Sequence, residues 1–332
     1  MSLTDPPPAL PAPDHTSHRG GRSHLRTAPR RPADPGAITG VLITDWQQTG
    51  TDTFVLGAQW PRGHAFYTPI AGVWHDPLLA AESLRQASLL VGRSYDGIPR
   101  GHRWAVSELD IEVAPAGLLA HHRPSTFQLE MARVPDPAPG AGTAPGTGGV
   151  TAMTMEAELL RDDDTFVGAG RIGLRILPPT ARTHPHAIRP GPPTGPPLLP
   201  RALPPPVVGR LNTRDVTLGI PATRSEQGVH VWQLRIDPTH PALPDEPTGH
   251  IPVMLLLEAA RQAAQAVSTP YRVLPIEIRS TFHHPVELHS PCTITATPLR
   301  QYDATEETAV RVTGTQNGVQ AFDSLIVTTP TD

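Results

Sequence analysis

The sequence predicts an α+β protein in which one unit, an antiparallel sheet wrapped around a single helix, occurs twice in tandem. One observation is a motif that recurs at a fixed offset. His64 precedes Glu82 by 18 positions, and His240 precedes Glu258 by the same 18, 176 residues later. The other observation is that strand-like and helix-like segments follow the same order on both sides of a proline-rich tract. Together they indicate an internal duplication.

The two copies of the motif agree beyond the histidine and the glutamate. Residues 82–87 and 258–263 both read Glu-x-x-Arg-Gln-Ala, without gaps. The matched pairs are Arg85 with Arg261 and Gln86 with Gln262. Each copy therefore carries a carboxylate, an imidazole and a guanidinium at equivalent places.

Each copy is expected to begin with a strand hairpin and a loop holding the motif histidine, followed by one helix and four strands. The expected elements of the first copy are strands at 38–46 and 53–60, a helix at 77–92, and strands at 102–113, 124–134, 151–161 and 164–176. Those of the second are strands at 207–218 and 229–236, a helix at 252–268, and strands at 273–283, 291–300, 307–314 and 319–328. Antiparallel strands wrapped around a buried helix form a hotdog, so the prediction is a tandem double hotdog.

Both expected helices are apolar on nearly every face, which indicates that they are buried nearly all round. Leucine and alanine make up most of residues 78–90 and of residues 254–263. Pro77 and Pro252 suit the first helical position, because the missing N–H has no helical partner there anyway. Asp76 can also cap the first helix.

Proline-rich segments set the expected domain boundaries. Residues 1–36 have almost no large apolar side chains, which predicts a disordered tail. Residues 178–206 hold several Pro-Pro pairs and are expected to form an extended linker. The first hotdog repeat then spans 37–177 and the second spans 207–330. We expect the repeats to form a pseudo-dimer, with their sheets paired edge to edge and both helices on the same side.

The composition excludes several classes of function. All 27 basic residues are arginine, which rules out Schiff-base chemistry on lysine. The formal net charge of −4 gives no electrostatic sign of nucleic-acid binding, and the single cysteine, Cys292, excludes an internal disulfide. No apolar stretch is long enough to span a membrane and no signal peptide is visible, so we expect a cytoplasmic protein without a membrane partner.

Several short strings occur in the same order in both halves. In the first half they are Asp45-Trp46 and residues 59–64, 75–82 and 97–102; in the second they are residues 232–237, 250–254 and 257–263. These strings resemble the A-factor biosynthesis hotdog family. The resemblance covers about residues 37–176 and 207–330, which leaves out the expected tail and linker.

The resemblance implies an acyltransferase that begins the synthesis of actinobacterial γ-butyrolactone signals. The implied reaction transfers a β-ketoacyl group from an acyl carrier protein to a hydroxyl of dihydroxyacetone phosphate, without a cofactor. The implied partners are the loaded carrier protein and dihydroxyacetone phosphate. The chain itself is expected to act as a monomeric pseudo-dimer or a weak homo-oligomer.

The glutamate and arginine of each motif lie three residues apart on a helix, so their side chains share a face. Two roles fit these pairs, Glu82 with Arg85 and Glu258 with Arg261. The glutamates can act as general bases on the acceptor hydroxyl, with the arginines binding its phosphate through their bidentate fork. Alternatively, each pair is a buried ion pair that fixes the helix to its sheet.

His64 and His240 are candidate catalytic residues because both keep the same spacing to a glutamate. In single-domain hotdogs, histidine and acid come from different subunits. We therefore expect His64 to pair with Glu258 and Arg261, and His240 to pair with Glu82 and Arg85. Secondary candidates are His75, His250, Gln86 and Gln262. The histidines lack the regular spacing of metal ligands, so no metal site is expected.

Two other classes of function remain open. The segment from His240 to Ala263 is also similar to hotdog 3-hydroxyacyl-thioester dehydratases, although Val253 replaces their helix-start glycine and Arg261 places a charge where they have none. A thioesterase is a related alternative. A non-catalytic acyl-binding regulatory module would have lost the motif residues, and neither copy has lost them. Acyl chain length, the final product (butyrolactone, furan or butenolide) and which composite site works are left undecided.

Overall fold

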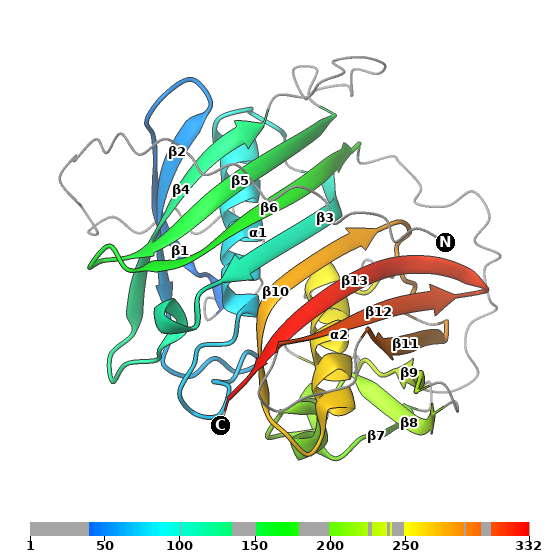
Figure 1. Ribbon diagram of the computed structural model, residues 1–332. Coiled ribbons are helices and arrows are strands. Elements are labelled where there is room, and N and C mark those ends of the chain that lie inside the picture. Colours follow the sequence, from blue (N-terminus) through cyan, green and yellow to red (C-terminus); the bar gives the residue numbers. More distant parts are fainter. Residues whose placement is uncertain are drawn as a thin grey trace, which may run out of the picture.

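The computed structural model describes residues 40–99, 101–134, 151–178, 199–224, 228–237, 240, 249–288, 290–299 and 307–331. The tail expected at 1–36 lies outside these residues, as does most of the expected linker. Within them, the chain forms two similar halves that share one continuous sheet (Figure 1).

In its described residues, the first half contains six strands and one long helix. Its elements are β1 (Ile43–Gln48), β2 (Thr53–Trp60), α1 (Leu78–Ser94), β3 (Arg103–Val113), β4 (Ser125–Val134), β5 (Ala152–Arg161) and β6 (Phe166–Leu177). The second half repeats this order after a short added strand. Its elements are β7 (Arg201–Ala202), β8 (Leu218–Arg224), β9 (His230–Leu234), α2 (Val253–Ser268), β10 (Val273–Phe282), β11 (Cys292–Pro298), β12 (Thr308–Gln316) and β13 (Val319–Pro330).

The sheet is antiparallel throughout its described pairs, and its strand order mirrors itself about the middle. The order runs β1-β2-β4-β5-β6-β3 and then β10-β13-β12-β11-β9-β8-β7. The halves meet where β3 pairs with β10, with Ile111 opposite Ile278. Both α1 and α2 lie on the same side of this sheet and contact each other. The predicted edge-to-edge pseudo-dimer is therefore confirmed, as is the double hotdog fold.

Both helices are buried on almost every face, as their apolar sequences predict. The few polar side chains of α1 are satisfied locally. Ser83, for example, accepts a hydrogen bond from the Trp60 indole at 2.9 Å and donates to the Leu79 carbonyl at 2.8 Å. At the helix start, Pro77 is the N-cap residue, and Asp76 Oδ1 accepts a hydrogen bond from the Leu78 N–H at 3.0 Å. A polar helix face can thus be buried without unpaired groups.

The strand predicted at 207–218 is wrong. That segment forms short 3₁₀ turns at Pro205–Val208 and Thr213–Asp215, and the strand β8 starts only at Leu218. Gly209 has a φ of 65°, a conformation that suits glycine and ends the first turn. The turns point the side chains of Arg210 and Asp215 inward, where both are buried. A strand would have sent alternate side chains outward.

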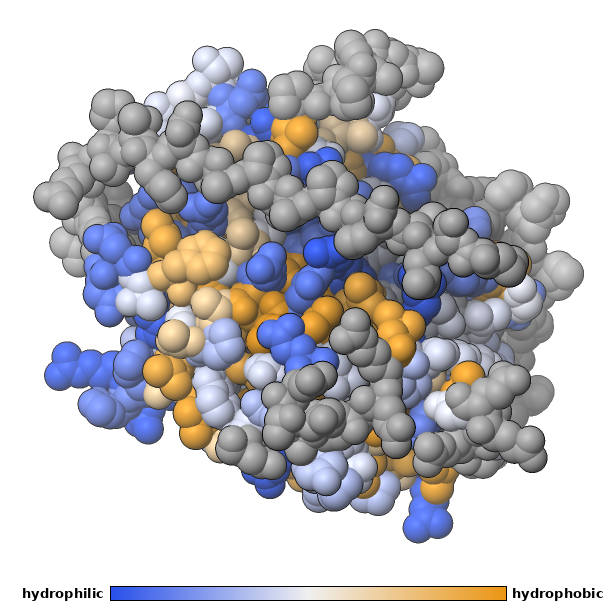
Figure 2. Space-filling view, in the orientation of Figure 1, coloured by the Kyte–Doolittle hydropathy of each residue, from blue (hydrophilic) through white to orange (hydrophobic). Residues whose placement is uncertain are grey.

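The structured part of the second half also begins earlier than expected. The short strand β7 pairs with β8 inside the tract predicted to be linker, and Leu203 and Val208 are buried in the core. The buried apolar side chains of both halves form one continuous core. In the orientation of Figure 1, hydrophobic residues gather near the middle of the visible face, bordered by hydrophilic ones (Figure 2). Among the described helices, none is both long and apolar enough to cross a membrane.

Candidate active site

Helix α1 carries the first Glu-x-x-Arg-Gln motif, here named the open cluster: Glu82, Arg85 and Gln86. Arg85 holds Glu82 through a bidentate contact, Nε to Oε2 at 2.8 Å and Nη2 to Oε1 at 2.7 Å. Gln86 Nε2 donates to Glu82 Oε1 at 2.8 Å. The side chain of Arg85 is 23% exposed and that of Glu82 is 11% exposed. The ion pair is therefore within reach of a solute.

The motif glutamine ties this pair to the first strand region. The Gln86 side chain accepts the Leu42 N–H at 2.9 Å and donates to the Gly40 carbonyl at 2.6 Å. Each backbone group paired in this way would otherwise be buried without a partner. The structural role of Gln86 explains why glutamine recurs in both copies, and no contact with a reacting group is needed to account for it.

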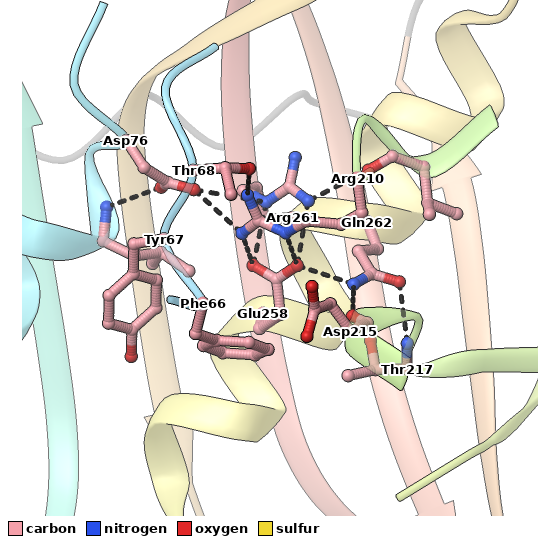
Figure 3. Close-up of polar contacts among 12 residues, drawn as sticks. Phe66, Tyr67, Thr68, Asp76, Arg210, Asp215, Thr217, Glu258, Arg261 and Gln262 are labelled. Carbon is pink, nitrogen blue, oxygen red and sulfur yellow. Dashed lines mark hydrogen bonds and ion pairs between the residues drawn. The ribbon is translucent and has the colours of Figure 1, made fainter. Parts of the chain in front are cut away.

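Helix α2 repeats the same inner geometry (Figure 3). Arg261 contacts Glu258 through Nε to Oε2 and Nη2 to Oε1, both at 2.9 Å. Gln262 donates to Glu258 Oε1 at 2.6 Å, accepts from the Thr217 N–H at 2.8 Å and donates to the Asp215 carbonyl at 2.7 Å. The repeated Glu-x-x-Arg-Gln sequence thus forms the same set of hydrogen bonds on both helices.

The motif on α2 differs from the one on α1 because a second arginine contacts its glutamate. Arg210, from the turn before β8, donates to both oxygens of Glu258, Nε to Oε1 at 2.7 Å and Nη2 to Oε2 at 2.5 Å. Its Nη2 also donates to Oδ2 of Asp76, in the other repeat, at 2.8 Å. We name Asp76, Arg210, Glu258 and Arg261 the closed cluster. Three of these side chains are 0% exposed and Arg261 is 2% exposed.

The electrostatics of the closed cluster hold Glu258 and Arg210 in their charged forms. Burial alone raises the pKa of Glu258, but Arg210 and Arg261 outweigh it and lower the pKa to about 2. Burial alone lowers the pKa of Arg210, and Glu258 and Asp76 raise it above its ordinary value. Two positive and two negative charges balance within the cluster. A buried network of this kind is stable only when every partner is present.

The contacts of the closed cluster argue against two expected roles, those of Glu258 as a base and Arg261 as a phosphate ligand. The two carboxylate oxygens of Glu258 accept five hydrogen bonds, which come from Arg210, Arg261 and Gln262. A carboxylate with a pKa of about 2 and no exposed surface does not serve as a general base near neutral pH. The guanidinium of Arg261 is likewise turned to Glu258 and the Val208 carbonyl, and it is not open to a phosphate. The contacts of this copy favour the structural alternative.

His64 lies in the loop between β2 and α1. Its Nδ1 accepts two backbone N–H groups, from Phe66 and Tyr67, both at 3.1 Å. Its ring stacks on the Tyr67 ring with centroids 4.9 Å apart. Burial lowers the pKa of His64 more than the nearby carboxylates of Asp76 and Glu82 raise it. The histidine is therefore neutral near pH 7, and the charges of Asp76, Glu82 and Arg210 all act on it.

His240 has a different environment. Its Nε2 lies 2.9 Å from Asp215 Oδ1, and both side chains are nearly buried. The Phe66 ring packs edge-on against it at 4.8 Å. These contacts place His240 beside Asp215 and Phe66, and the crosswise pairing of each histidine with the opposite Glu-Arg pair stays a prediction. The loop from the first repeat crosses to the second, where Phe66 packs on His240 and both Thr68 and Asp76 accept hydrogen bonds from Arg210.

The secondary candidate histidines have structural contacts. His75 is 1% exposed, with Nε2 3.0 Å from Ser125 Oγ and its ring edge-on to Trp60. Burial, followed by the charge of Arg161, lowers its pKa to about 4, so it is neutral. His250 forms a backbone bridge with Glu287 just before α2.

The described side chains favour an anion over a metal ion as a bound group. Among them, no three His, Cys, Asp or Glu residues gather as a metal site requires. Of the two motif arginines, Arg85 is the one exposed enough to bind an anion. Residues that sequence reasoning missed are Arg210, Asp215 and Tyr67, none of which belongs to the Glu-x-x-Arg-Gln repeat. The candidate site is thus the open cluster with His64.

Comparison with known proteins identifies the family. Residues 35–138 and 194–332 match the A-factor biosynthesis hotdog domain. A 2-oxo-3-(phosphooxy)propyl 3-oxoalkanoate synthase from Streptomyces virginiae is 34% identical over 302 residues, covering 91% of this chain and 97% of that protein. A synthase of the same name from Streptomyces griseus subsp. griseus is 33% identical over 327 residues, covering 98% of this chain and 96% of that protein.

A solved structure supports the fold. A proposed oleoyl thioesterase from Lactobacillus plantarum superposes with a TM-score of 0.50 at 8% identity, covering 85% of this chain and 98% of that one. This likeness concerns the fold alone. The match to the family domain and the two relatives span both repeats, so the chain belongs to the A-factor biosynthesis hotdog family.

Proposed function

We propose that this protein transfers a β-ketoacyl group from the thioester of an acyl carrier protein to a hydroxyl of dihydroxyacetone phosphate. The relatives are named for an ester of a 3-oxoalkanoate with a 2-oxo-3-(phosphooxy)propyl group. Joining a 3-oxoacyl group to one hydroxyl of dihydroxyacetone phosphate gives that ester. The observation that carries the proposal is the partly exposed Glu82–Arg85 pair beside His64.

Arg85 is suited to bind the acceptor phosphate. Its planar fork already grips a carboxylate in the bidentate way in which arginine also grips phosphate. A phosphate carries more charge than the carboxylate and offers more acceptor oxygens, so it competes effectively for the same donors. The expected result of acceptor binding is that Arg85 turns from Glu82 to the phosphate.

This exchange prepares Glu82 as a base. A carboxylate in a bidentate ion pair is a weak proton acceptor, and it becomes a stronger one when its cation is withdrawn. Glu82 then takes the proton of the acceptor hydroxyl while the hydroxyl oxygen bonds to the thioester carbonyl carbon. The tetrahedral intermediate expels the carrier thiolate, and the carboxylic acid of Glu82 returns the proton to that sulfur. One C–O bond forms and one C–S bond breaks.

The same exchange disfavours hydrolysis. Water cannot displace Glu82 from Arg85, so the base stays paired until a phosphorylated acceptor arrives. A hotdog thioesterase has the opposite requirement, because water is its acceptor. Hydrolysis is therefore the outcome that separates the proposed acyltransferase from its main alternative.

The test is mass spectrometry of the products formed from a β-ketoacyl carrier protein with and without dihydroxyacetone phosphate. We expect the phosphorylated ester when the acceptor is present and little free 3-oxo acid when it is absent. Dihydroxyacetone without phosphate is the matched control and should be a poor acceptor. Equal rates with both acceptors, or free acid as the main product, would contradict the proposal.

A further inference from the structure

The hydroxyl of Tyr67 has no protein partner among the described residues, and its oxygen is not one of the fully buried polar atoms. The residue is 6% exposed, and its ring is held between His64 and Phe66. In the part of the chain that the structure describes, nothing hydrogen-bonds to this hydroxyl. Figure 3 shows that it points away from Asp76 and the closed cluster. A tyrosine with a buried ring and an accessible, unpaired hydroxyl can donate a hydrogen bond to a bound group.

His64 presents a second donor of the same kind. Because Nδ1 accepts the N–H groups of Phe66 and Tyr67, the neutral ring carries its proton on Nε2. Protonation of Nδ1 would break both contacts, and burial also lowers the pKa of the ring. Near neutral pH the histidine is therefore an Nε2–H donor and not a base. The described residues supply no acceptor to this nitrogen.

The two donors are fixed relative to each other and to the open cluster. The backbone N–H of Tyr67 itself bonds to the His64 ring, and the two rings stack with an angle of 29° between their planes. Glu82 and Arg85 lie close enough to Tyr67 to act on its pKa. Burial is the largest effect on that pKa, followed by the carboxylates of Glu82, Glu258 and Asp76; all raise it, so the hydroxyl keeps its proton.

We propose that the Tyr67 hydroxyl and the His64 Nε2–H together form the oxyanion hole of the transfer reaction. Two neighbouring donors beside a base fit an oxygen atom that gains negative charge. As the acceptor oxygen bonds to the thioester carbon, the electron pair of the carbonyl bond moves onto the carbonyl oxygen, between these donors. Expulsion of the carrier thiolate returns the pair to the carbonyl bond. This inference rests on the proposed acyl transfer and adds Tyr67 to its catalytic residues.

The first experiment replaces Tyr67 with phenylalanine, which removes only the hydroxyl. Loss of one oxyanion donor lowers kcat by roughly 100- to 1,000-fold. KM for both substrates should stay close to wild type, because the contact forms mainly in the transition state. The melting temperature should not fall, since the hydroxyl has no protein partner. Tyr95→Phe is the matched control: that hydroxyl donates to the Thr51 carbonyl at 2.7 Å at an exposed site, and kcat should not change.

The second experiment separates a donor from a base at His64. A glutamine amide can place an N–H near the position of Nε2 but cannot accept a proton. His64→Gln should therefore keep clearly more activity than His64→Ala. Equal loss in both variants would indicate a base, and wild-type kcat in Tyr67→Phe would remove Tyr67 from the mechanism. A raised KM for dihydroxyacetone phosphate with unchanged kcat would make Tyr67 a phosphate ligand and overturn the oxyanion role.

The wild-type assay distinguishes failure of this inference from failure of the proposed function. If the unmutated protein hydrolyses the thioester without forming the ester, acyl transfer is wrong. Hydrolysis passes through the same tetrahedral oxyanion, so Tyr67→Phe must then lower the hydrolysis rate to the same extent. If the unmutated protein does neither reaction, both proposals fall.

Discussion

The open and closed clusters have the same Glu-x-x-Arg-Gln core, but their surroundings give them different properties. In both, arginine grips glutamate with two contacts and glutamine joins the glutamate to the backbone before a strand. In the closed cluster, Arg210 and Asp76 complete a fully buried network of four charges. No second described arginine contacts Glu82, and Arg85 remains partly exposed. The role of a buried ion pair thus depends on its neighbours more than on its motif.

The largest expected difference between the clusters is in catalysis. Glu82→Gln keeps the shape of the side chain but removes the base, so turnover should fall by roughly 100- to 10,000-fold. Its melting temperature should change little. Glu258→Gln should instead lower the melting temperature, because two buried arginines lose their charge partner. Steady-state product formation and thermal unfolding measure the two effects. Equal losses of turnover at equal stability would show that both glutamates are catalytic.

The next effect is in stability. Arg210→Met removes one of the two cations that neutralise the buried carboxylates of Asp76 and Glu258. We therefore expect the free energy of unfolding to fall by about 3–5 kcal/mol. Arg85→Met removes a partly exposed partner and should cost about 1 kcal/mol. Urea denaturation of both variants gives the comparison. Similar losses in both would mean that the open cluster supports the fold as strongly as the closed one.

A smaller effect concerns substrate binding. Arg85→Lys keeps the charge but breaks the bidentate fork, so KM for dihydroxyacetone phosphate should rise about ten- to a hundredfold, the value of one charge-assisted hydrogen bond. KM for the acyl thioester should stay near wild type. Arg261→Lys should reduce stability and leave both KM values unchanged in the folded fraction. A rise in both KM values for Arg85→Lys would point to a general loss of structure.

The smallest effect at neutral pH is the acid dependence of the closed cluster. The pKa of Glu258 is about 2 in the folded protein, below its ordinary value of 4.5. The unfolded chain therefore binds more protons between these values, and the free energy of unfolding falls as the pH drops through this window. Arg210→Met weakens the attraction that lowers this pKa, so the fall should be smaller and should end at a higher pH. Denaturation midpoints from pH 6 to pH 2 measure it, and identical profiles would show that Arg210 does not set the pKa.

Much of the fold could be predicted from the sequence because its signals are local. Apolar periodicity located α1 and α2, and alternation located most strands. The ion pairs could be predicted too, because residues three apart on a helix must share a face. Arg210 could not, since it lies 48 residues from Glu258 and 134 from Asp76, inside a segment without periodicity. Tyr67 was missed for the same reason: its position relative to His64 depends on the folded loop.

The contact between Asp76 and Arg210 joins the two repeats and has a consequence for how this chain can change. In a symmetric homodimer, every substitution appears twice, once on each side of the axis. In a fused chain, Arg210 occurs once. The cluster on α2 can therefore join the two repeats, while the cluster on α1 keeps an accessible ion pair. Substitutions around Arg85 can then alter which acceptor is used without disturbing the network that holds the halves together. Gene fusion would in this way separate the evolution of specificity from the maintenance of stability.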